Sequence, residues 1–579
     1  MSQECSSIVS DYMIKILENY NNLRGKYLDI SESPFWDVVL ISASDASQKA
    51  GYELQITAKQ QRGELPLNID FIVFSDPPGF KIGCGGSTMD VMERVFQIYG
   101  TRMHNMRFLL IPAGGYSQRL PNLSVLGKLF SPLPFKENGY QMLDLILATY
   151  LPFLTSMPPG VFLASSDAII SYSLDDNDSW SFKTGGFTAL AHPSPVLVGT
   201  THGVYVLPNN VGTHGSSFMS ECLRVLQKPT VKEMEENGAI VRSFSNSGEE
   251  EDTVFSDSAF FFDHTITKKL IKFYQSNKPL KCEISSYGDF LQPLGHLASP
   301  SYIVNYTDNE HQASLQSALY AQLHGTPLSV MVLKNSNFHH LGTMQEYVDS
   351  LCGGNKFSED FPITKFSFVS LSTNFLAPTF VDGTIIHSVI HSWSVIPESS
   401  VVEYCDIHIA MDVGSNCIIS NVQVDGFPIQ RVPHKVPDNT MLHTVILKEG
   451  FVTVAFGLAD DIKKSHPVED YLEVEYFGKK LGNFIKMKDP IFDASVTRVS
   501  LWTAKLFRVC STPEDSFKRT LEMVLCVDEC IPNHSNFTLD RSLGKWVSMA
   551  QILLLLKDTE AMVKYQKKLF DKINKQKEI

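Results

Sequence analysis

Three features that mark common classes of protein are missing from this sequence. The longest purely aliphatic run covers residues 552–556 and is far too short to cross a bilayer. Residues 1–11 contain no basic stretch followed by an apolar one, so we expect no secretory signal. The 10 cysteines are spread singly along the chain, which is typical of reduced thiols and not of a disulfide framework. These absences predict a cytoplasmic protein without a membrane partner.

Positive charge is also scarce. The chain has 63 acidic and 49 basic residues, a net charge of −14, which argues against nucleic acid or an acidic membrane as a partner. A nucleotide ligand is not excluded, because a few local cations suffice to hold one. Cys526 and Cys530 would share a helix face, but no second Cys/His pair accompanies them, so we expect packing there and not zinc.

What the sequence does contain is an alternation of helical and strand-like segments. Its length of 579 residues allows two to four domains. Apolar residues at helical spacing predict an opening helix over 8–23, and further helices begin near 45 and 89. Short, mostly apolar runs predict buried strands at 37–41, 71–74, 108–111 and 161–164. Strands that alternate with helices predict a doubly wound, Rossmann-like α/β sheet.

The stretch from 108 to 130 has the parts of a polyphosphate-binding loop. A buried strand ends at Pro112, and Gly114 and Gly115 then let the backbone approach a ligand. Arg119 and Lys128 follow on the loop, where Arg binds phosphate bidentately and Lys acts as a point charge. On composition alone, an ordinary turn with two surface cations explains the same residues.

The spacing in this stretch excludes two familiar phosphate motifs and resembles a third. Asn122 stands where a Walker A motif needs its first glycine, Leu129 replaces its Ser/Thr, and no GxGxxG occurs here. The stretch resembles the signature of sugar-1-phosphate nucleotidyltransferases, and its fuller string AGGYSQRLPNLSVLGK resembles the fucose-1-phosphate guanylyltransferase branch. Ser117 and Gln118 depart from the Gly-Thr of the wider family. The matching residues are Ala113, Gly114, Gly115, Arg119, Leu120 and Lys128.

A second glycine-rich run comes one βα unit earlier, directly before the predicted helix at 89–99. Glycines that open a helix suit an anion or nucleotide, because the first-turn N–H groups have no partner within the helix. The run alone could be only a tight turn, but the same arrangement occurs in the branch named above. The nucleotide-binding candidates in it are Gly83, Gly85, Gly86, Ser87 and Thr88.

The resemblance also implies two aspartates for Mg²⁺ and a lysine for the sugar phosphate. Asp167 follows the strand at 161–164, at the edge where open α/β sheets bind ligands, and a helix N-cap is its alternative role. Asp257 is chosen over Asp263 as the second metal ligand. Lys228 lies in a Gln-Lys-Pro string similar to the family's EKP element, whose lysine meets the sugar phosphate.

Other polar groups are expected to be structural. The acidic segment 248–253 is predicted to be a solvated loop. His202, His214 and the His339-His340 pair show no ligand spacing, so we expect polar loop or core histidines there.

From 383 to 424 the pattern changes to a period of six residues. This period is typical of a parallel β-helix, and the resemblance implies a left-handed one. The period places Val401 in the interior and leaves Val402 free to face solvent. Strands at 440–460 and a helix over 545–575 are predicted beyond it. The repeating aliphatic residues are Val389, Val395, Val401, Ile407, Val413 and Ile419.

The prediction as a whole is an α/β enzyme with three regions. They are a nucleotidyltransferase domain at 1–372, a left-handed β-helix at 373–430 and a strand-rich then helical region at 431–579. By resemblance its substrates are GTP and fucose 1-phosphate, its cofactor is Mg²⁺, and Arg119 and Lys128 are its catalytic cations. The alternatives are another sugar or base, or a regulatory homologue that binds nucleotide-sugar without turnover.

Overall fold

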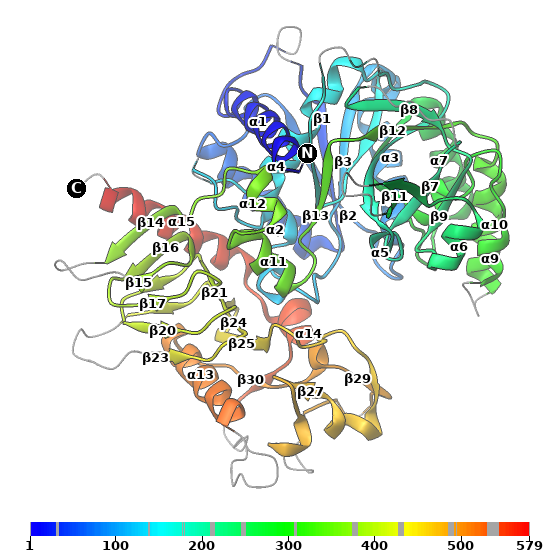
Figure 1. The fold of residues 1–579 in the computed structure, drawn as a ribbon. Coiled ribbons are helices and arrows are strands. Elements are labelled where there is room, and N and C mark those ends of the chain that lie inside the picture. The colour runs from blue at the N-terminus through cyan, green and yellow to red at the C-terminus, as the bar shows by residue number, and fades with distance from the viewer. Residues whose placement is uncertain are drawn as a thin grey trace. The chain divides into compact units, whose positions relative to one another are not determined.

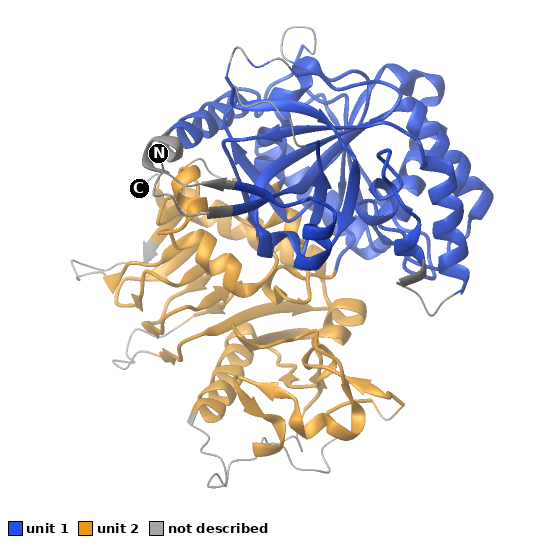
Figure 2. Cartoon of the chain, turned by 45° about the vertical axis from the view of Figure 1, so that its right-hand side comes forward, with its two compact units in different colours: residues 1–115, 143–340 blue, residues 116–142, 341–579 orange. Residues whose placement is uncertain are grey.

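The chain forms two compact units, which are coloured separately in Figure 2. One contains residues 1–115 and 143–340, and the other contains 116–142 and 341–579. The three regions predicted above stay a prediction. The computed structural model describes residues 2–29, 34–136, 139–175, 178, 180–208, 215–244, 250–305, 310–372, 380–425, 434–484, 491–493, 495–529 and 544–577.

A mixed sheet forms the centre of the first unit (Figure 1). Four parallel strands lie side by side in the order β2 (Asp70–Ser75), β1 (Val38–Ala43), β3 (Arg107–Pro112) and β4 (Gly160–Leu163). All six residues of β1 are buried, as expected for a parallel strand covered on both faces. These four strands confirm the strands that were predicted from apolar runs in the sequence.

The sheet continues with strands of mixed direction. β11 (Glu250–Asp263) is antiparallel to both β4 and β6 (Phe187–Pro195), and β12 (Leu328–Leu333) is parallel to β6. The prediction of a solvated loop at 248–253 is therefore wrong for residues 250–253, which belong to β11. Pairing with β10 (Val241–Phe244) extends this acidic segment as a strand.

Amphipathic helices cover the sheet and share its hydrophobic core. α3 (Gly83–Tyr99), α7 (His264–Asn277) and α10 (Glu310–Leu323) contribute to one buried cluster that also contains alternate residues of β1 and β3. α3 contacts β1 and β3, α7 contacts β4 and β11, and α10 contacts α7. α1 (Ser2–Asn21) confirms the predicted opening helix. α2 (Ala46–Gln61) begins where the side chain of Asp45 accepts a hydrogen bond from the Gln48 amide.

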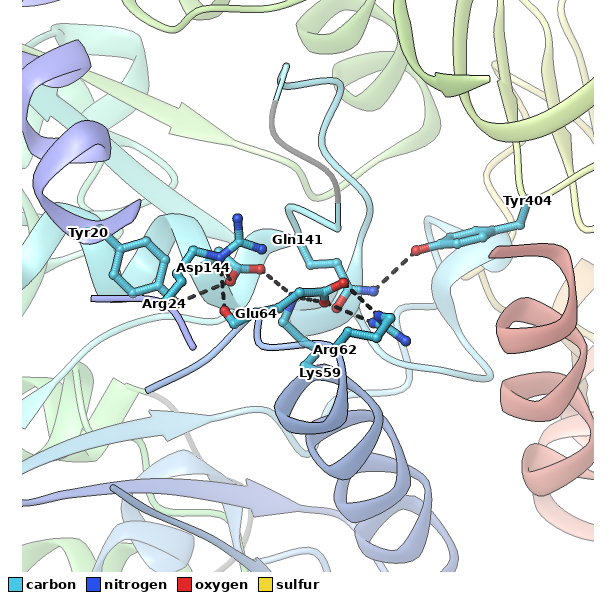
Figure 3. A network of polar contacts seen from close by, with 8 residues as sticks. All are labelled: Tyr20, Arg24, Lys59, Arg62, Glu64, Gln141, Asp144 and Tyr404. Carbon is cyan, nitrogen blue, oxygen red and sulfur yellow. Dashed lines mark hydrogen bonds and ion pairs between the residues drawn. The ribbon is translucent and has the colours of Figure 1, made fainter. Parts of the chain in front are cut away.

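A buried ionic network ties α1 and α2 to α4 (Met142–Tyr150), as seen in Figure 3. Lys59 Nζ lies 2.7 Å from Asp144 and 3.0 Å from Glu64, and Tyr20 donates a 3.1 Å hydrogen bond to Asp144. Burial acts to raise the pKa of Glu64, but Lys59 and Arg62 outweigh it and lower that pKa to about 2. Each buried charge is thus compensated, which is the condition for keeping it in a core.

Parallel strands that pair at fixed intervals dominate the second unit. β16 (Thr384–His391), β18 (Val401–Glu403) and β21 (Ile418–Ser420) pair in parallel, with Thr384 opposite Val401 and Val401 opposite Ile418. Each of these pairs joins residues 17 positions apart. α15 (Thr559–Lys577) packs on β14 (Phe366–Ser372) and β16 through a cluster that includes Phe368, Val389 and Leu569.

The six-residue period describes this region with two corrections. Val395 is 38% exposed, whereas the other five aliphatic residues of the period are buried. Val402 is 1% exposed, so the expectation that it faces solvent is wrong. Successive side chains of β18 point to opposite faces, and the next residue, Glu403, is also buried. Both faces of this strand are buried. The six-residue period follows only the residues of one face, so it carries no information about the other face.

The rest of the second unit confirms the strands predicted at 440–460. The helix predicted over 545–575 is correct as one helix only for its later part, because α15 begins at Thr559 and residues Trp546–Val547 form a strand, β31. β24 (Thr440–Leu447) and β25 (Gly450–Gly457) form an antiparallel hairpin, and β24 also pairs in parallel with β21. α13 (Pro513–Glu529) packs on β25. A second parallel set contains β15 (Phe380–Val381), β17 (Val395–Ile396), β20 (Met411–Val413) and β23 (His434–Val436).

Candidate functional site

Two neighbouring strands of the first unit place Asp167 and Asp257 at the same edge of the sheet. β4 and β11 are antiparallel, with Leu163 opposite Phe260. Asp167 comes four residues after Leu163, and Asp257 comes three residues before Phe260, at a register shift in β11. Asp257 lies within β11, in the part of that strand that extends past the carboxyl end of β4. Both predicted metal ligands therefore lie past the carboxyl end of β4.

Asp257 is a buried carboxylate held by a backbone amide. It is 6% exposed, and the Gly203 N–H donates a 3.0 Å hydrogen bond to its Oδ1. Burial raises the pKa of Asp257 to about 6, against the opposite effects of this hydrogen bond and of the positive charge of Lys228. A Cβ at Gly203 would collide with the carboxylate, so this glycine is needed for the close approach. Asp263 instead caps α7, which supports the choice of Asp257.

Lys228 lies beside Asp257. It follows β9 (Arg224–Gln227), which pairs with β7 (Gly203–Val206) so that Gln227 is opposite Gly203. The Lys228 amide donates a 3.0 Å hydrogen bond to the His202 carbonyl, and its φ is 48°. A lysine in this left-handed region is uncommon, and such strained residues often cluster at functional sites. The structure thus joins the predicted sugar-phosphate lysine to the second predicted metal ligand.

Asp167 has polar neighbours of its own. Ser165 donates a 2.8 Å hydrogen bond to its Oδ1, and His340 Nε2 lies 3.7 Å from its Oδ2. The next element is β5 (Ala168–Tyr172), a strand, so the alternative role of Asp167 as a helix N-cap is wrong. His340 ends β13 (Ser336–His340), which pairs with β5.

Two histidines and a tyrosine at this edge were not among the predicted site residues. His202 and His340 have ring centroids 6.2 Å apart, and their expected role as polar loop or core histidines stays a prediction. Burial raises the pKa of Tyr287 well above its ordinary value, and the charges of Asp257 and Asp167 add to the shift. The Tyr287 hydroxyl is buried and has no hydrogen-bond partner in the described part of the chain, as expected of a group that meets a ligand. His339 is a core residue as expected, and His214 lies outside the described residues.

The run from Gly83 to Thr88 forms the first turns of α3, which begins earlier than the predicted position 89. A Cβ at Gly83 or Gly85 would come within 3 Å of the Ile284 carbonyl oxygen, and the Gly85 amide donates a 2.8 Å hydrogen bond to that oxygen. A Cβ at Gly86 would crowd Ile82 and Leu280. The Ser87 hydroxyl donates to Asp76 at 2.6 Å, and that of Thr88 donates to the Cys84 carbonyl. These glycines thus allow close packing, and their contact with a nucleotide stays a prediction.

Gly114 and Gly115 follow β3 at the carboxyl edge of the parallel strands. A Cβ at Gly114 would lie 3.2 Å from the Ser44 amide nitrogen, so the two strand ends approach closely here. Gly115 is exposed, and nothing lies within 4 Å of where its Cβ would be. Ligands of open α/β sheets bind beyond this edge. The position supports the predicted nucleotide contact without requiring it.

Arg119 and Lys128 belong to the second unit. The segment 116–142 packs there, with the Met344 amide donating a 3.1 Å hydrogen bond to the Arg119 carbonyl. Arg119 is exposed, and Lys128 Nζ donates a 3.3 Å hydrogen bond to the Gly342 carbonyl. Ser117 has a φ of 49°, a conformation that favours glycine, which accounts for the glycine usual in the wider family. The predicted catalytic cations and the predicted metal ligands are thus divided between the two units.

The donor set fits a magnesium ion, although metal ligands are few. No group of three or more His, Cys, Asp or Glu suited to a metal occurs among the residues that the structure describes. Mg²⁺ is commonly held by one or two carboxylates together with substrate phosphates and water. Asp167 and Asp257, two carboxylates at one sheet edge, match that requirement.

Comparisons with known proteins identify sequences that are similar to this chain. Residues 100–512 match the model of the fucose pyrophosphorylase domain. The chain is 37% identical to a fucose-1-phosphate guanylyltransferase of Mus musculus, over 97% of each chain. It is 34% identical to one of Homo sapiens, over 96% of this chain and 94% of that one. A bifunctional fucokinase/GDP-fucose pyrophosphorylase of Arabidopsis thaliana is 22% identical over 86% of this chain and 48% of its own length. No described helix is long and apolar enough to cross a membrane.

Proposed function

This chain belongs to the fucose pyrophosphorylase family, and on that premise we propose that it makes GDP-L-fucose and pyrophosphate from GTP and β-L-fucose 1-phosphate, in fucose salvage. The observation that carries the proposal is that Asp167 and Asp257 both lie past the carboxyl end of β4 and that the charge of Lys228 acts on Asp257. Two carboxylates for a cation and one lysine for a phosphate are the groups that transfer between phosphates requires.

The reaction is a single in-line displacement. A phosphate oxygen of fucose 1-phosphate bonds to the α-phosphorus of GTP, and the bond from that phosphorus to the pyrophosphate oxygen breaks. Attacker and target are both anionic, so the protein's task is to align them and to neutralise charge. No general base is required, because a sugar phosphate is already ionised near neutral pH.

Each predicted residue has a role in this scheme. Lys228 binds the phosphate of fucose 1-phosphate, Lys128 binds the α-phosphate, and Arg119 holds the leaving pyrophosphate. Asp167 and Asp257 hold Mg²⁺, which when bound neutralises the phosphoryl oxygens. The glycine turns at 83–86 and 114–115 line the nucleotide.

We also propose a fold for parts of the two units and a location for the protein. The first unit contains a Rossmann-like nucleotidyltransferase sheet, which its four parallel strands with flanking helices support. The region predicted at 373–430 is a short left-handed β-helix, supported within the described residues 384–424 by parallel pairs 17 positions apart and by five buried positions of the six-residue period. A cytoplasmic location is supported by the cysteines, since eight free ones occur among the described residues.

The choice of substrates tests the proposal. The purified protein is offered each of the four ribonucleoside triphosphates with fucose, mannose, glucose and N-acetylglucosamine 1-phosphates, with and without Mg²⁺, and pyrophosphate release is measured. We expect GTP with fucose 1-phosphate to lead by at least about 100-fold, because buried polar contacts left unpaired by a wrong base or sugar are costly.

Each other outcome has a defined meaning. A preference for UTP or for another sugar contradicts the branch and keeps the reaction class. No release with any pair, together with tight binding of GDP-fucose, favours a regulatory homologue. An unchanged rate in EDTA contradicts the metal assignment.

A further inference from the structure

A buried carboxylate lies behind the loop that carries the two catalytic cations. Glu403, the last residue of β18, is 1% exposed and is not part of the proposed chemistry. Its Oε1 accepts hydrogen bonds from Asn122 Nδ2 at 3.0 Å and from Ser420 Oγ at 2.7 Å, and its Oε2 accepts one from the Tyr347 hydroxyl at 2.5 Å. Three neutral donors thus converge on one acid. Burial raises the pKa of Glu403, and these hydrogen bonds oppose that shift.

The partners of Glu403 connect it directly to the loop. Asn122 lies between Arg119 and Lys128 in sequence and is 4% exposed, so its side chain is enclosed. Tyr347 belongs to α11 (Met344–Leu351), and the segment that begins this helix bonds to the loop on both sides of Asn122. On one side the Met344 amide donates to the Arg119 carbonyl, and on the other Lys128 donates to the Gly342 carbonyl.

A second contact holds the far end of the same segment. Gln141 Nε2 donates a 3.2 Å hydrogen bond to the hydroxyl of Tyr404, the residue after Glu403 (Figure 3). Glu403 at the end of β18 and Tyr404 directly after it therefore bind the two ends of the segment 122–141. All of these groups lie in the second unit.

A carboxylate is a costly choice if stability alone were needed here. Burying a charged or polar group costs free energy that well-packed apolar residues would not cost. What an acid with three donors adds is direction, because hydrogen bonds fix the orientation of their partners and apolar contacts do not. The loop requires a fixed orientation, because its cations stabilise a transition state only when they are aligned with it.

We propose that Glu403 is a positioning residue, which through Asn122 and Tyr347 fixes the loop that presents Arg119 and Lys128. This inference rests on the proposed function for the role of the two cations. It assigns the stacked parallel strands a part in turnover, as the rigid support of the catalytic loop.

The test compares three variants of the full-length protein. Glu403→Ala leaves Asn122 and Tyr347 without their acceptor, and we expect kcat to fall about 10- to 100-fold while KM for GTP changes less than about 3-fold. Glu403→Gln keeps an acceptor for Asn122 and should restore kcat to within about 5-fold of the wild type. Asp406→Asn is the matched control, because it removes an acid of the next strand, β19 (Asp406–Ile407), that pairs with Lys572 and not with the loop. Its kcat should be unchanged.

Hydrogen exchange of the backbone amides at 117–128 provides a readout that does not depend on activity. We expect faster exchange there in Glu403→Ala than in the wild type, and no such change in Asp406→Asn. If Glu403→Ala does not fold, Asn122→Ala replaces it, since this change removes only the loop's own hydrogen bond and should lower kcat by a similar factor.

The results separate failure of this inference from failure of the proposed function. Normal kcat and normal loop exchange in folded Asn122→Ala or Glu403→Ala overturn the positioning role, even when the wild type makes GDP-fucose. Equal loss of kcat in Glu403→Ala and Glu403→Gln also overturns it. A wild type that releases no pyrophosphate contradicts the proposed function, and loop exchange then still decides whether Glu403 orders the loop.

Discussion

Replacing Lys128 with alanine should lower kcat by about 100- to 1,000-fold and leave the protein folded. The substitution removes a charge placed to meet the negative charge that develops on the α-phosphate during displacement. Lys128 is half-buried and donates a hydrogen bond to the backbone carbonyl of Gly342, which water can satisfy after the change. Pyrophosphate release measures the rate, and circular dichroism measures the fold.

The control is Lys136→Ala on the same segment. Lys136 is exposed and carries the same charge, so its removal tests whether net charge alone matters. We expect its kcat to stay within about 2-fold of the wild type, because an exposed charge is screened by salt. Near-normal turnover in well-folded Lys128→Ala would remove the basis for assigning catalysis to this loop.

The largest effect on stability is expected from aspartate at either position of the pair Val401 and Val402. Each side chain is at most 1% exposed, so each substitution buries a charge without a prepared partner. We expect each to lower the free energy of unfolding by at least about 3 kcal/mol. Val395→Asp is the control, since Val395 is 38% exposed on β17 of the same unit.

Denaturant unfolding of the three variants measures how much stability each aspartate costs at a buried and at an exposed position. The control should lose less than about 1 kcal/mol, because its new charge stays in water. If Val402→Asp were tolerated as well as Val395→Asp, this face of β18 would be open to solvent and its observed burial would not hold in solution.

The parallel part of the fold could be predicted because its signal is local. Runs such as 37–41 and 108–111 are short, mostly apolar and followed by turn residues, which leaves little alternative to buried strands. The mixed direction of the sheet could not be predicted, since the pairing of β11 with β4 and β6 depends on partners distant in sequence.

In the candidate site, too, some residues could be predicted from the sequence, whereas their contacts could not. Lys228 and Asp257 were predicted by resemblance, and only the pairing of β7 with β9 shows why they are neighbours. His340 is separated from Asp167 by more than 170 residues, so no spacing in the sequence connects them. Glu403 did leave a local signal, a lone acid between the aliphatic pair 401–402 and Tyr404, but its partners could not be read from it.

The most direct test of the proposed reaction follows the oxygen atoms of fucose 1-phosphate. The three terminal phosphate oxygens are labelled with ¹⁸O, and the products formed with GTP and Mg²⁺ are weighed by mass spectrometry. Attack by the sugar phosphate on the α-phosphorus predicts GDP-fucose that retains all three labels and pyrophosphate that contains none. GDP-fucose that has lost one label, label in the pyrophosphate, or no GDP-fucose at all would contradict the account.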